Sequence, residues 1–243
     1  MITFLASSPT KALDEECPVP TLNEKNGFVA QLQQIWRENA RCLMVVADPD
    51  AHSLNDEMTD FYREAVIGSG LSVGCFDLWD SRYLEFSAEQ LGQYDVIFLS
   101  GGHVPTERAW FEWIHLKEKL EAFHGILIGT SAGSMNAARV VYAWPEMEGE
   151  SEDPDYELFF PGLGLAESMI LPHYQQVKDS YLDGKRLIED IACSHSYGKR
   201  FWAIPDGSYI LVQDGVETIF GEAYLISDGK IEQFCEEGDI RTL

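Results

Sequence analysis

Apolar runs alternate with segments of helical periodicity along the first 140 residues. Five runs are short and continuous, as expected of strands buried on both faces: 1–6, 41–47, 71–78, 94–100 and 125–128. Three segments between them repeat apolar residues at helical spacing: 28–36, 53–66 and 105–123. This alternation predicts an α/β fold with a doubly wound, mostly parallel sheet and helices on both of its faces.

The residues at the ends of these segments predict where the helices begin and end. Ser53 or Asn55 is expected to cap the second helix, which should end at Gly68. The third helix is expected to run unbroken from Pro105 to Phe123. Its predicted buried face consists of Trp110, Trp113, Ile114 and Leu120.

The pattern changes after residue 200 to short β segments separated by Asp-Gly pairs. These pairs occupy positions 206–207, 214–215 and 228–229. Asp-Gly is typical of tight hairpin turns, so we expect C-terminal β-hairpins that close the far edge of the sheet. Neither an internal repeat nor a linker interrupts the sequence, and residues 1–243 are therefore predicted to form a single domain.

The composition and net charge of the chain indicate which classes of binding partner to expect. The 243 residues are 45% hydrophobic, and the formal net charge is −24. A surface this negative repels phosphate backbones and anionic lipids, so we expect neither nucleic-acid binding nor membrane attachment. The five cysteines are scattered without a Cys-x-x-Cys pair, which argues against a disulfide framework and a zinc site. With no signal-peptide pattern or long apolar span, we expect a cytoplasmic protein that uses neither a metal nor another cofactor.

One segment carries the strongest chemical signal. Residues 125–136 read as a short apolar strand that runs into Gly-Thr-Ser-Ala-Gly and then into a stretch compatible with a helix. A sharp strand-to-helix turn lifts a serine hydroxyl clear of the sheet, and flanking glycines permit that turn because they carry no Cβ. The pattern predicts that Ser131 is a nucleophile at such a turn.

A nucleophilic serine needs a base and a carboxylate that orients the base. Of the six histidines, His103 and His173 follow predicted strands, and the proline before His173 fixes the turn in front of it. Asp206 also follows an apolar segment, although taken alone it is an ordinary Asp-Gly turn residue. Because ligands bind at the carboxyl ends of the strands in such sheets, we expect these side chains at one rim of the sheet.

Four motifs in this order make the sequence recognisable: Ser-Gly-Gly-His, Gly-Thr-Ser-Ala-Gly-Ser, Leu-Pro-His-Tyr and Ile-Pro-Asp-Gly-Ser. Together they resemble the dipeptidase E family of serine peptidases, which shares its fold with class I glutamine amidotransferases. The resemblance covers nearly the whole chain and implies that Ser131 is the nucleophile and His173 the base. Asp206 lies where the aspartyl dipeptidases of the family carry a glutamate in a Pro-Glu-Gly turn. This departure leaves the third member of the triad open.

The same layout predicts the rest of the site. The backbone N–H groups of Gly102 and Ala132 are expected to form an oxyanion hole. The resemblance implies a small peptide or amide substrate, for example a dipeptide with an N-terminal aspartate. Such a substrate needs a local cation in so acidic a protein, and the candidates are His103, Arg108 and Arg139. The oligomeric state, monomer or homodimer, stays open.

Three other interpretations remain at this point. An α/β-hydrolase esterase has the chain order Ser, acid, His, which Asp155 or Glu157 could satisfy. A binding protein could keep the turn without activity, and a metalloenzyme would draw on Asp48, Asp50, His52 and His103. Seven acidic residues within 146–157 predict a solvated, mobile loop, or alternatively a lid or selectivity element.

Overall fold

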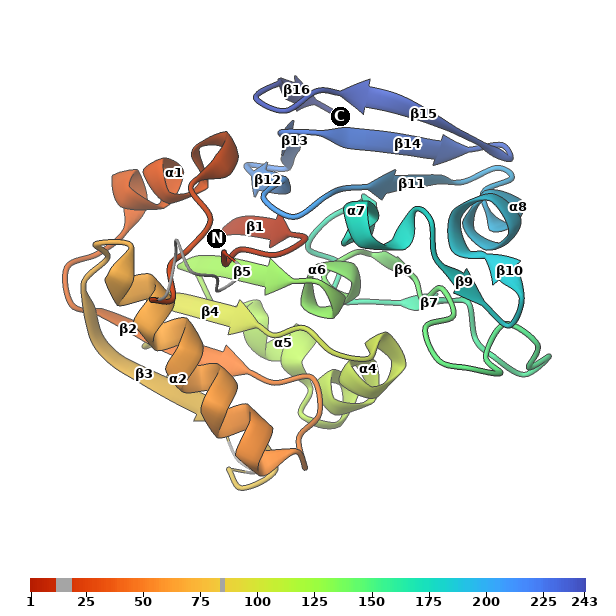
Figure 1. The fold of residues 1–243 in the computed structure, drawn as a ribbon. Coiled ribbons are helices and arrows are strands. Elements are labelled where there is room, and N and C mark those ends of the chain that lie inside the picture. Colours follow the sequence, from red (N-terminus) through yellow and green to blue (C-terminus); the bar gives the residue numbers. More distant parts are fainter. Residues whose placement is uncertain (12–18, 84–85) are drawn as a thin grey trace.

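The computed structural model describes residues 1–11, 19–83 and 86–243. Its main sheet contains five parallel strands: β1 (Ile2–Ala6), β2 (Ala40–Val45), β3 (Val73–Trp79), β4 (Val96–Leu99) and β5 (Ile126–Thr130). Three antiparallel strands extend the sheet beyond β1: β12 (Tyr209–Gln213), β13 (Val216–Phe220) and β16 (Ile240–Thr242). The order is β16-β13-β12-β1-β5-β4-β2-β3 (Figure 1). The five apolar runs expected from the sequence are thus the five parallel strands.

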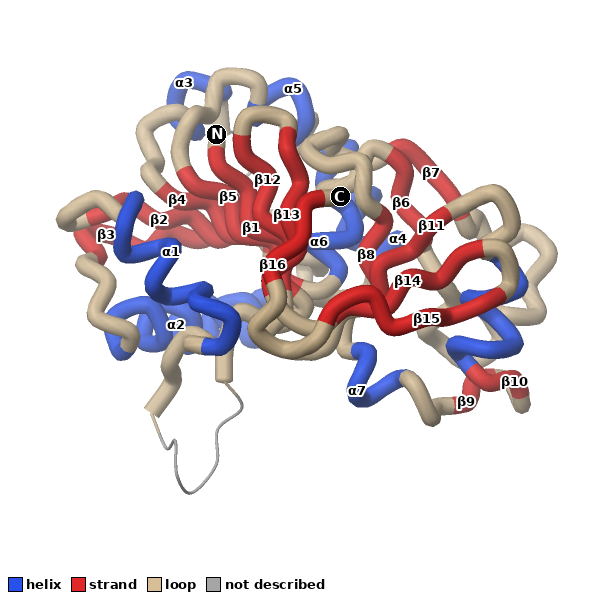
Figure 2. The backbone as a smooth tube through the Cα atoms, turned by 90° about the horizontal axis from the view of Figure 1, so that it is seen from above, coloured by secondary structure: helices blue, strands red, loops and turns tan. Residues whose placement is uncertain are grey.

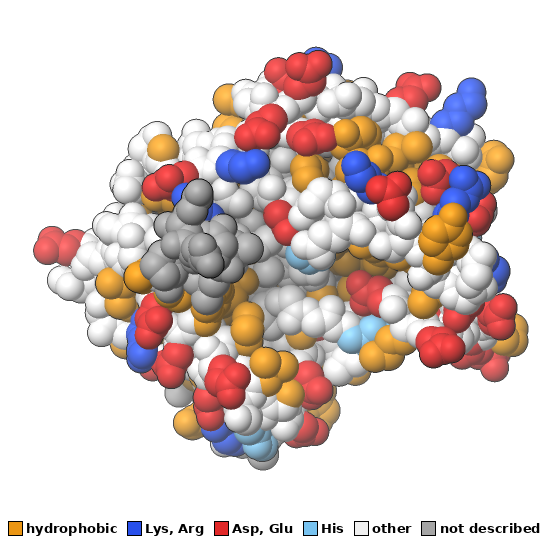
Figure 3. All heavy atoms as spheres, in the orientation of Figure 1, with side chains coloured by type: hydrophobic (Ala, Val, Ile, Leu, Met, Phe, Trp, Pro, Cys, Tyr) orange, Lys and Arg blue, Asp and Glu red, His pale blue; other side chains and the backbone are white. Residues whose placement is uncertain are grey.

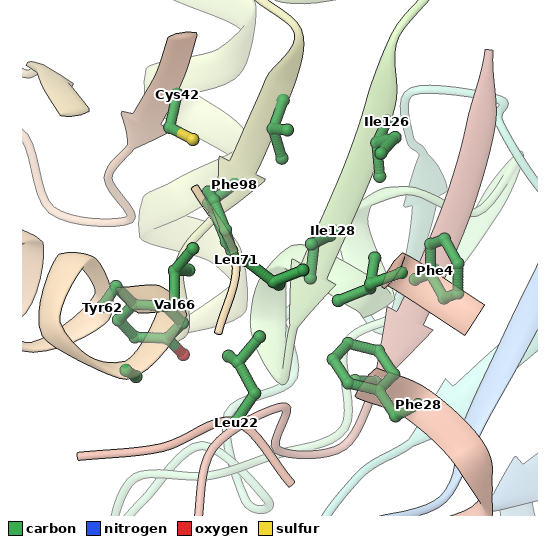
Figure 4. Packing of buried hydrophobic residues seen from close by; sticks show 14 of the residues in the cluster. Phe4, Leu22, Phe28, Cys42, Tyr62, Val66, Leu71, Phe98, Ile126 and Ile128 are labelled. Atoms are coloured by element: carbon green, nitrogen blue, oxygen red, sulfur yellow. The ribbon is translucent and has the colours of Figure 1, made fainter. Parts of the chain in front are cut away.

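Helices cover both faces of this sheet, which confirms the doubly wound α/β prediction. After a 3₁₀ turn at Lys25–Gly27, α1 (Phe28–Ile35) and α2 (His52–Gly68) pack on one face, and α3 (Ala88–Leu91), α4 (Val104–Trp113) and α5 (Leu116–Leu120) pack on the other. Because side chains alternate along a strand, Phe98 points to the face of α1 and α2, where it packs near Tyr62 (Figure 4), and its neighbour Ile97 points to the opposite face.

A second, four-stranded sheet lies beside the main one (Figure 2). Its strands are β8 (Met169–Leu171), β11 (Arg200–Ala203), β14 (Ala223–Ser227) and β15 (Lys230–Cys235). Smaller elements are α6 (Ala132–Asn136), α7 (Tyr174–Val177), α8 (Cys193–His195), the π-helix Leu187–Ala192, and the hairpins β6 (Val140–Tyr142) with β7 (Phe159–Pro161) and β9 (Tyr181–Leu182) with β10 (Lys185–Arg186). Leu5 and Ile210 of the main sheet share one hydrophobic cluster with Ile170 and Trp202 of the second.

The prediction of one helix over residues 105–123 is wrong. The chain forms α4 and α5 instead, separated at His115, whose φ of +52° lies in the left-handed region. Ile114 and Leu120 are buried as expected, but Trp113 is 57% exposed. A residue in the left-handed region does not continue a right-handed helix, so the helix is interrupted at His115. Trp113 precedes the break and stacks on Trp110, whereas Leu116 and Leu120, which follow the break, share one hydrophobic cluster with Trp110.

Two further expectations need correction. Helix α2 begins at His52 with Ala51 at its N-cap, and Asn55 donates its side chain to the carbonyl of Asp48 instead of capping. The Asp-Gly pairs also differ in what they connect. The pair at 214–215 joins β12 to β13 in the main sheet, and the pair at 228–229 joins β14 to β15 in the second sheet. The pair at 206–207 closes no hairpin, because it lies on the path from β11 to β12, between the two sheets.

The residues that the structure describes include no helix with both the length and the apolar content needed to cross a bilayer. Four cysteines in the same part of the chain are free thiols, namely Cys42, Cys75, Cys193 and Cys235, whereas Cys17 falls outside it.

Candidate active site

Ser131 lies at a sharp turn between β5 and α6. Its backbone has φ +49° and ψ −113°, a strained conformation for a residue with a side chain. The flanking glycines are required by close packing on either side. A Cβ on Gly129 would lie 2.9 Å from the backbone of Ser134, and one on Gly133 would lie 2.5 Å from the carbonyl oxygen of Leu99. The predicted strand–turn–helix around Ser131 is therefore present.

His173 and Asp206 reach Ser131 from the second sheet. Strands β8 and β11 are parallel neighbours with Leu171 opposite Ala203, so the residues just after each strand emerge at the same edge. The His173 Nε2 lies 3.0 Å from the Ser131 Oγ, and its Nδ1 lies 2.8 Å from the Asp206 Oδ1. The structure thus joins the three candidate side chains in one hydrogen-bonded chain, with Ser131 contributed by the main sheet.

Ser7 is a member of this cluster that the sequence analysis missed. It is fully buried, its Oγ donates to the Asp206 Oδ1 at 2.6 Å, and the same Oγ accepts the backbone N–H of His173 at 2.7 Å. In β1 and β5, Ala6 pairs with Thr130, so Ser7 leaves its strand beside Ser131. In the sequence, Ser7 is only a small polar residue directly after a buried strand. Its position indicates a role in the site only when β1 is known to lie next to β5.

Asp206 is held as an ionised carboxylate. Burial works to raise its pKa, but the hydrogen bonds from His173 and Ser7 outweigh burial, and the pKa lies below its ordinary value. Its other oxygen accepts the side-chain amide of Gln176 at 3.2 Å. Because a group with a lowered pKa stabilises the fold above its ordinary pKa, this stabilisation is lost as the pH falls through the lowered value.

The glycine loop after β4 lies against Ser131. A Cβ on Gly101 would come within 3.2 Å of the Ser131 Cβ, and one on Gly102 would come within 2.5 Å of the Ala47 Cβ. Only glycine lets the backbone approach this closely. On the other side of Ser131, the N–H of Ala132 is the first of α6 and has no acceptor within the helix. Both predicted oxyanion donors therefore belong to backbone that flanks the serine.

The three candidate substrate-binding cations are already engaged by carboxylates. His103 bonds Thr106 through Nδ1 and Glu150 through Nε2, at 2.8 and 2.9 Å. The Arg108 guanidinium bonds Glu112 and Glu157 and lies over the ring of Phe160, and Arg139 pairs with Glu167. Acidic side chains are also spread widely over the face drawn in Figure 3. An anionic substrate would have to compete with the protein's own carboxylates for each of these cations.

The acidic segment 146–157 forms side-chain hydrogen bonds with the residues around it. Glu150 bonds His103 next to the glycine loop. Asp183 accepts the backbone N–H of Gly149 at 2.8 Å and the hydroxyl of Ser151 at 2.7 Å. The segment therefore has a defined position beside the site.

The residues of the other interpretations are arranged differently. Glu157 pairs with Arg108, and the His173 Nδ1 bonds Asp206, which follows His173 in the chain. These contacts therefore give the order Ser, His, acid and not the order Ser, acid, His of an α/β-hydrolase esterase. Within residues 1–11, 19–83 and 86–243, no group of three or more His, Cys, Asp or Glu side chains is placed to hold a metal ion.

Comparison with known proteins gives concordant matches. The family model described as peptidase family S51 matches residues 49–219, a range that includes Ser131, His173 and Asp206. A crystal structure of a peptidase from an acI-B1 Actinobacterium aligns with a TM-score of 0.60 at 15% identity, over 100% of this chain and 96% of that one. A putative peptidase E protein from Listeria monocytogenes EGD-e aligns with a TM-score of 0.52 at 14% identity, over 96% and 97%. No curated protein matches the sequence.

Proposed function

The chain belongs to peptidase family S51, as the four ordered motifs predicted, and on that premise we propose that it is a serine peptidase that hydrolyses short peptides or related amides. Ser131 is the nucleophile, His173 the general base and Asp206 the residue that orients the base. The observation that carries this proposal is the continuous hydrogen-bonded chain from the Ser131 Oγ through both ring nitrogens of His173 to the Asp206 carboxylate.

The proposed triad assigns a proton to each hydrogen bond of this chain. The ionised Asp206 accepts a hydrogen bond from the N–H of the His173 Nδ1, which leaves Nε2 as the acceptor for the Ser131 hydroxyl. As the Ser131 Oγ attacks a carbonyl carbon, Nε2 takes the hydroxyl proton, and the carboxylate stabilises the imidazolium that forms. The proton then passes to the leaving amine as the C–N bond breaks. Water attacks the acyl-enzyme by the same route and releases the acid.

The negative charge that develops on the carbonyl oxygen is stabilised by the N–H groups of Gly102 and Ala132. These donors are backbone groups of tightly packed turns, so they need little reorganisation during the reaction. Removing a single oxyanion donor costs about 10²- to 10³-fold in turnover in serine proteases. The packing of the two turns is therefore as important to the proposal as the triad.

The charges around the site favour a neutral or basic substrate over an N-terminal aspartate. His103, Arg108 and Arg139 each bond a carboxylate, and a net charge of −24 opposes the approach of an anion. A free amino group is attracted by the same field. We therefore extend the proposal to short peptides with a free N-terminus and a neutral or basic first residue.

A fluorophosphonate probe is expected to label the folded protein at Ser131, because the activated hydroxyl attacks phosphorus as it attacks a carbonyl carbon. Mass spectrometry of the digested adduct gives the modified residue, and heat-denatured protein serves as the control that should not react. Absence of labelling in the folded protein would support a binding protein on a peptidase fold, and labelling at another serine would contradict the assignment of Ser131.

A substrate panel at fixed ionic strength tests the proposed preference. Neutral and basic dipeptides are expected to have kcat/KM values at least about tenfold above those of Asp-X dipeptides. Arg108 and Arg139 are already paired with carboxylates, so the negative charge of the protein repels the aspartate side chain of the substrate. Longer peptides and simple esters complete the panel. A preference for Asp-X that disappears in Arg108→Ala but persists in Arg139→Ala would contradict this expectation and identify Arg108 as the cation. Preference for longer peptides or esters would contradict a dipeptidase.

A further inference from the structure

A buried carboxyl that the proposed mechanism does not use joins the two turns of the site. Glu107 of α4 is 0% exposed, and Asn136 at the end of α6 is 1% exposed. The Asn136 Nδ2 donates to the Glu107 Oε2 at 2.8 Å and to the carbonyl oxygen of Val104 at 3.1 Å. Both amide hydrogens of Asn136 are thereby used.

Two acceptor atoms of this pair are left over. Within the part of the chain that the structure describes, the Glu107 Oε1 and the Asn136 Oδ1 are buried and have no hydrogen-bond partner. Turning the Asn136 amide over does not help, because its oxygen would then face the Val104 carbonyl and the Glu107 carboxyl. Unpaired buried acceptors are costly and rare, and here both belong to the same pair of side chains.

We infer that Glu107 is protonated on Oε1 in the folded protein and donates this proton to the Asn136 Oδ1. The carboxylic acid and the amide then form a ring closed by two hydrogen bonds, in which each group donates once and accepts once. One proton satisfies both orphaned acceptors. The Glu107 Oε1 and the Asn136 Oδ1 can bond each other only in this protonation state, because otherwise both are acceptors.

The charges around Glu107 agree with a neutral carboxyl. Burial raises its pKa well above the ordinary value, whereas the hydrogen bond from Asn136 opposes that shift. Helix α6 brings no ionisable side chain, and on α4 itself Arg108 and Glu112 pair with each other. Ionisable groups beside α4 on other segments include His103 at its N-cap, Glu150 bonded to His103, and Glu157 bonded to Arg108. They also include His115, Lys117 and Glu118, which line a cavity with Asn136, and Glu146. Of these, Glu146 acts on Glu107, and its negative charge disfavours ionisation further.

The ring links the two segments that carry the proposed oxyanion donors. Helix α4 begins two residues after Gly102, and α6 begins with Ala132. Asn136 holds α4 at two points, the Glu107 side chain and the Val104 carbonyl. Glu107 is therefore a positioning residue, which sets the distance between the glycine loop and the turn at Ser131. This second step rests on the proposed function, whereas the protonation of Glu107 does not.

Infrared difference spectroscopy on the full chain tests the protonation without any substrate. Isotope-labelled glutamate should shift a protonated-carboxyl band at neutral pH, and that band should be missing in Glu107→Gln. Its persistence in Glu107→Gln, or its absence from the wild type, would overturn the inference even if the protein is an active peptidase.

Chemical unfolding at several pH values gives an independent measure. Glutamine is neutral at every pH and can form the same ring with Asn136, so Glu107→Gln should fold. Because the pKa of Glu107 is raised on folding, the wild type loses stability relative to Glu107→Gln as the pH rises above about 4.3. The ratio of the two unfolding constants should change about tenfold per pH unit, up to the pKa in the folded state. A ratio independent of pH would contradict a proton on Glu107.

Kinetics tests the positioning role. Glu107→Leu removes the ring and should lower kcat about tenfold or more with little change in KM, because the oxyanion donors act in the transition state. Glu107→Gln should restore kcat to near the wild-type value. Equal kcat in Glu107→Leu and Glu107→Gln would exclude a positioning role for Glu107, and the proton assignment would then be decided by the two measurements above. Loss of activity in Glu107→Gln alone would contradict the hydrogen-bonded ring between residues 107 and 136.

Discussion

Ser131→Ala is expected to lower kcat by at least about 10⁴-fold, and by up to about 10⁶-fold, while the protein remains folded. The substitution removes the Oγ that lies 3.0 Å from the His173 Nε2, and no other atom of residue 131 can form the acyl-enzyme. Turnover of a peptide that the wild type cleaves, with protein purified from a strain lacking other peptidases, gives the measurement. Retention of more than about one-hundredth of wild-type turnover would contradict the assignment.

Ser131→Gly is the matched control for the backbone. Alanine keeps the Cβ and with it the strain of φ +49° and ψ −113°, so Ser131→Ala should unfold at about the same denaturant concentration as the wild type. Glycine relieves a strain of about 1–3 kcal/mol, less about 0.4–1 kcal/mol for its greater freedom in the unfolded chain. We expect Ser131→Gly to be inactive yet at least as stable as Ser131→Ala. Greater stability of the alanine variant would show that the turn is not strained.

The elements that could be predicted are those with a strong local signal. Continuous apolar runs identified the five parallel strands, and glycines on both sides of Ser131 identified the turn, since Gly129 and Gly133 have no room for a Cβ. His173 and Asp206 followed from their positions after apolar segments, with the ordered motifs supplying the match to a family. Each of these signals lies within about ten consecutive residues, where periodicity and turn chemistry are informative.

The features that could not be predicted depend on contacts between distant segments. Whether β14 and β15 extend the main sheet or form a second one is decided by the pairing of β11 with β8 and β14, which no local pattern encodes. Ser7 becomes meaningful only through its bonds to residues more than 160 positions away. The break at His115 depends on a single residue in the left-handed region, which histidine adopts more readily than most residues but which the apolar pattern does not indicate.

The third residue of the proposed triad gives the second large expected effect. Asp206→Asn should lower kcat by up to about 10⁴-fold, the loss associated with the same change in Ser-His-Asp proteases. If the amide nitrogen faces the His173 Nδ1, the ring takes the wrong tautomer and Nε2 can no longer accept the serine proton. If the amide oxygen faces it, the tautomer survives but the negative charge that stabilises the imidazolium is lost. Steady-state kinetics on the same peptide, with circular dichroism to verify folding, measures the effect.

Ser7→Ala is the control that separates the charge of Asp206 from its position. It removes the hydroxyl that bonds both the Asp206 Oδ1 and the backbone N–H of His173, but leaves the carboxylate and its bond to the ring. One lost hydrogen bond to a charged group corresponds to about 1.5–3 kcal/mol, so kcat should fall by about ten- to a hundredfold, less than in Asp206→Asn. A loss below tenfold in Asp206→Asn would show that His173 does not depend on this carboxylate. In that case Ser131 and His173 would act as a dyad, with Ser7 and the backbone of β8 and β11 holding the histidine in place.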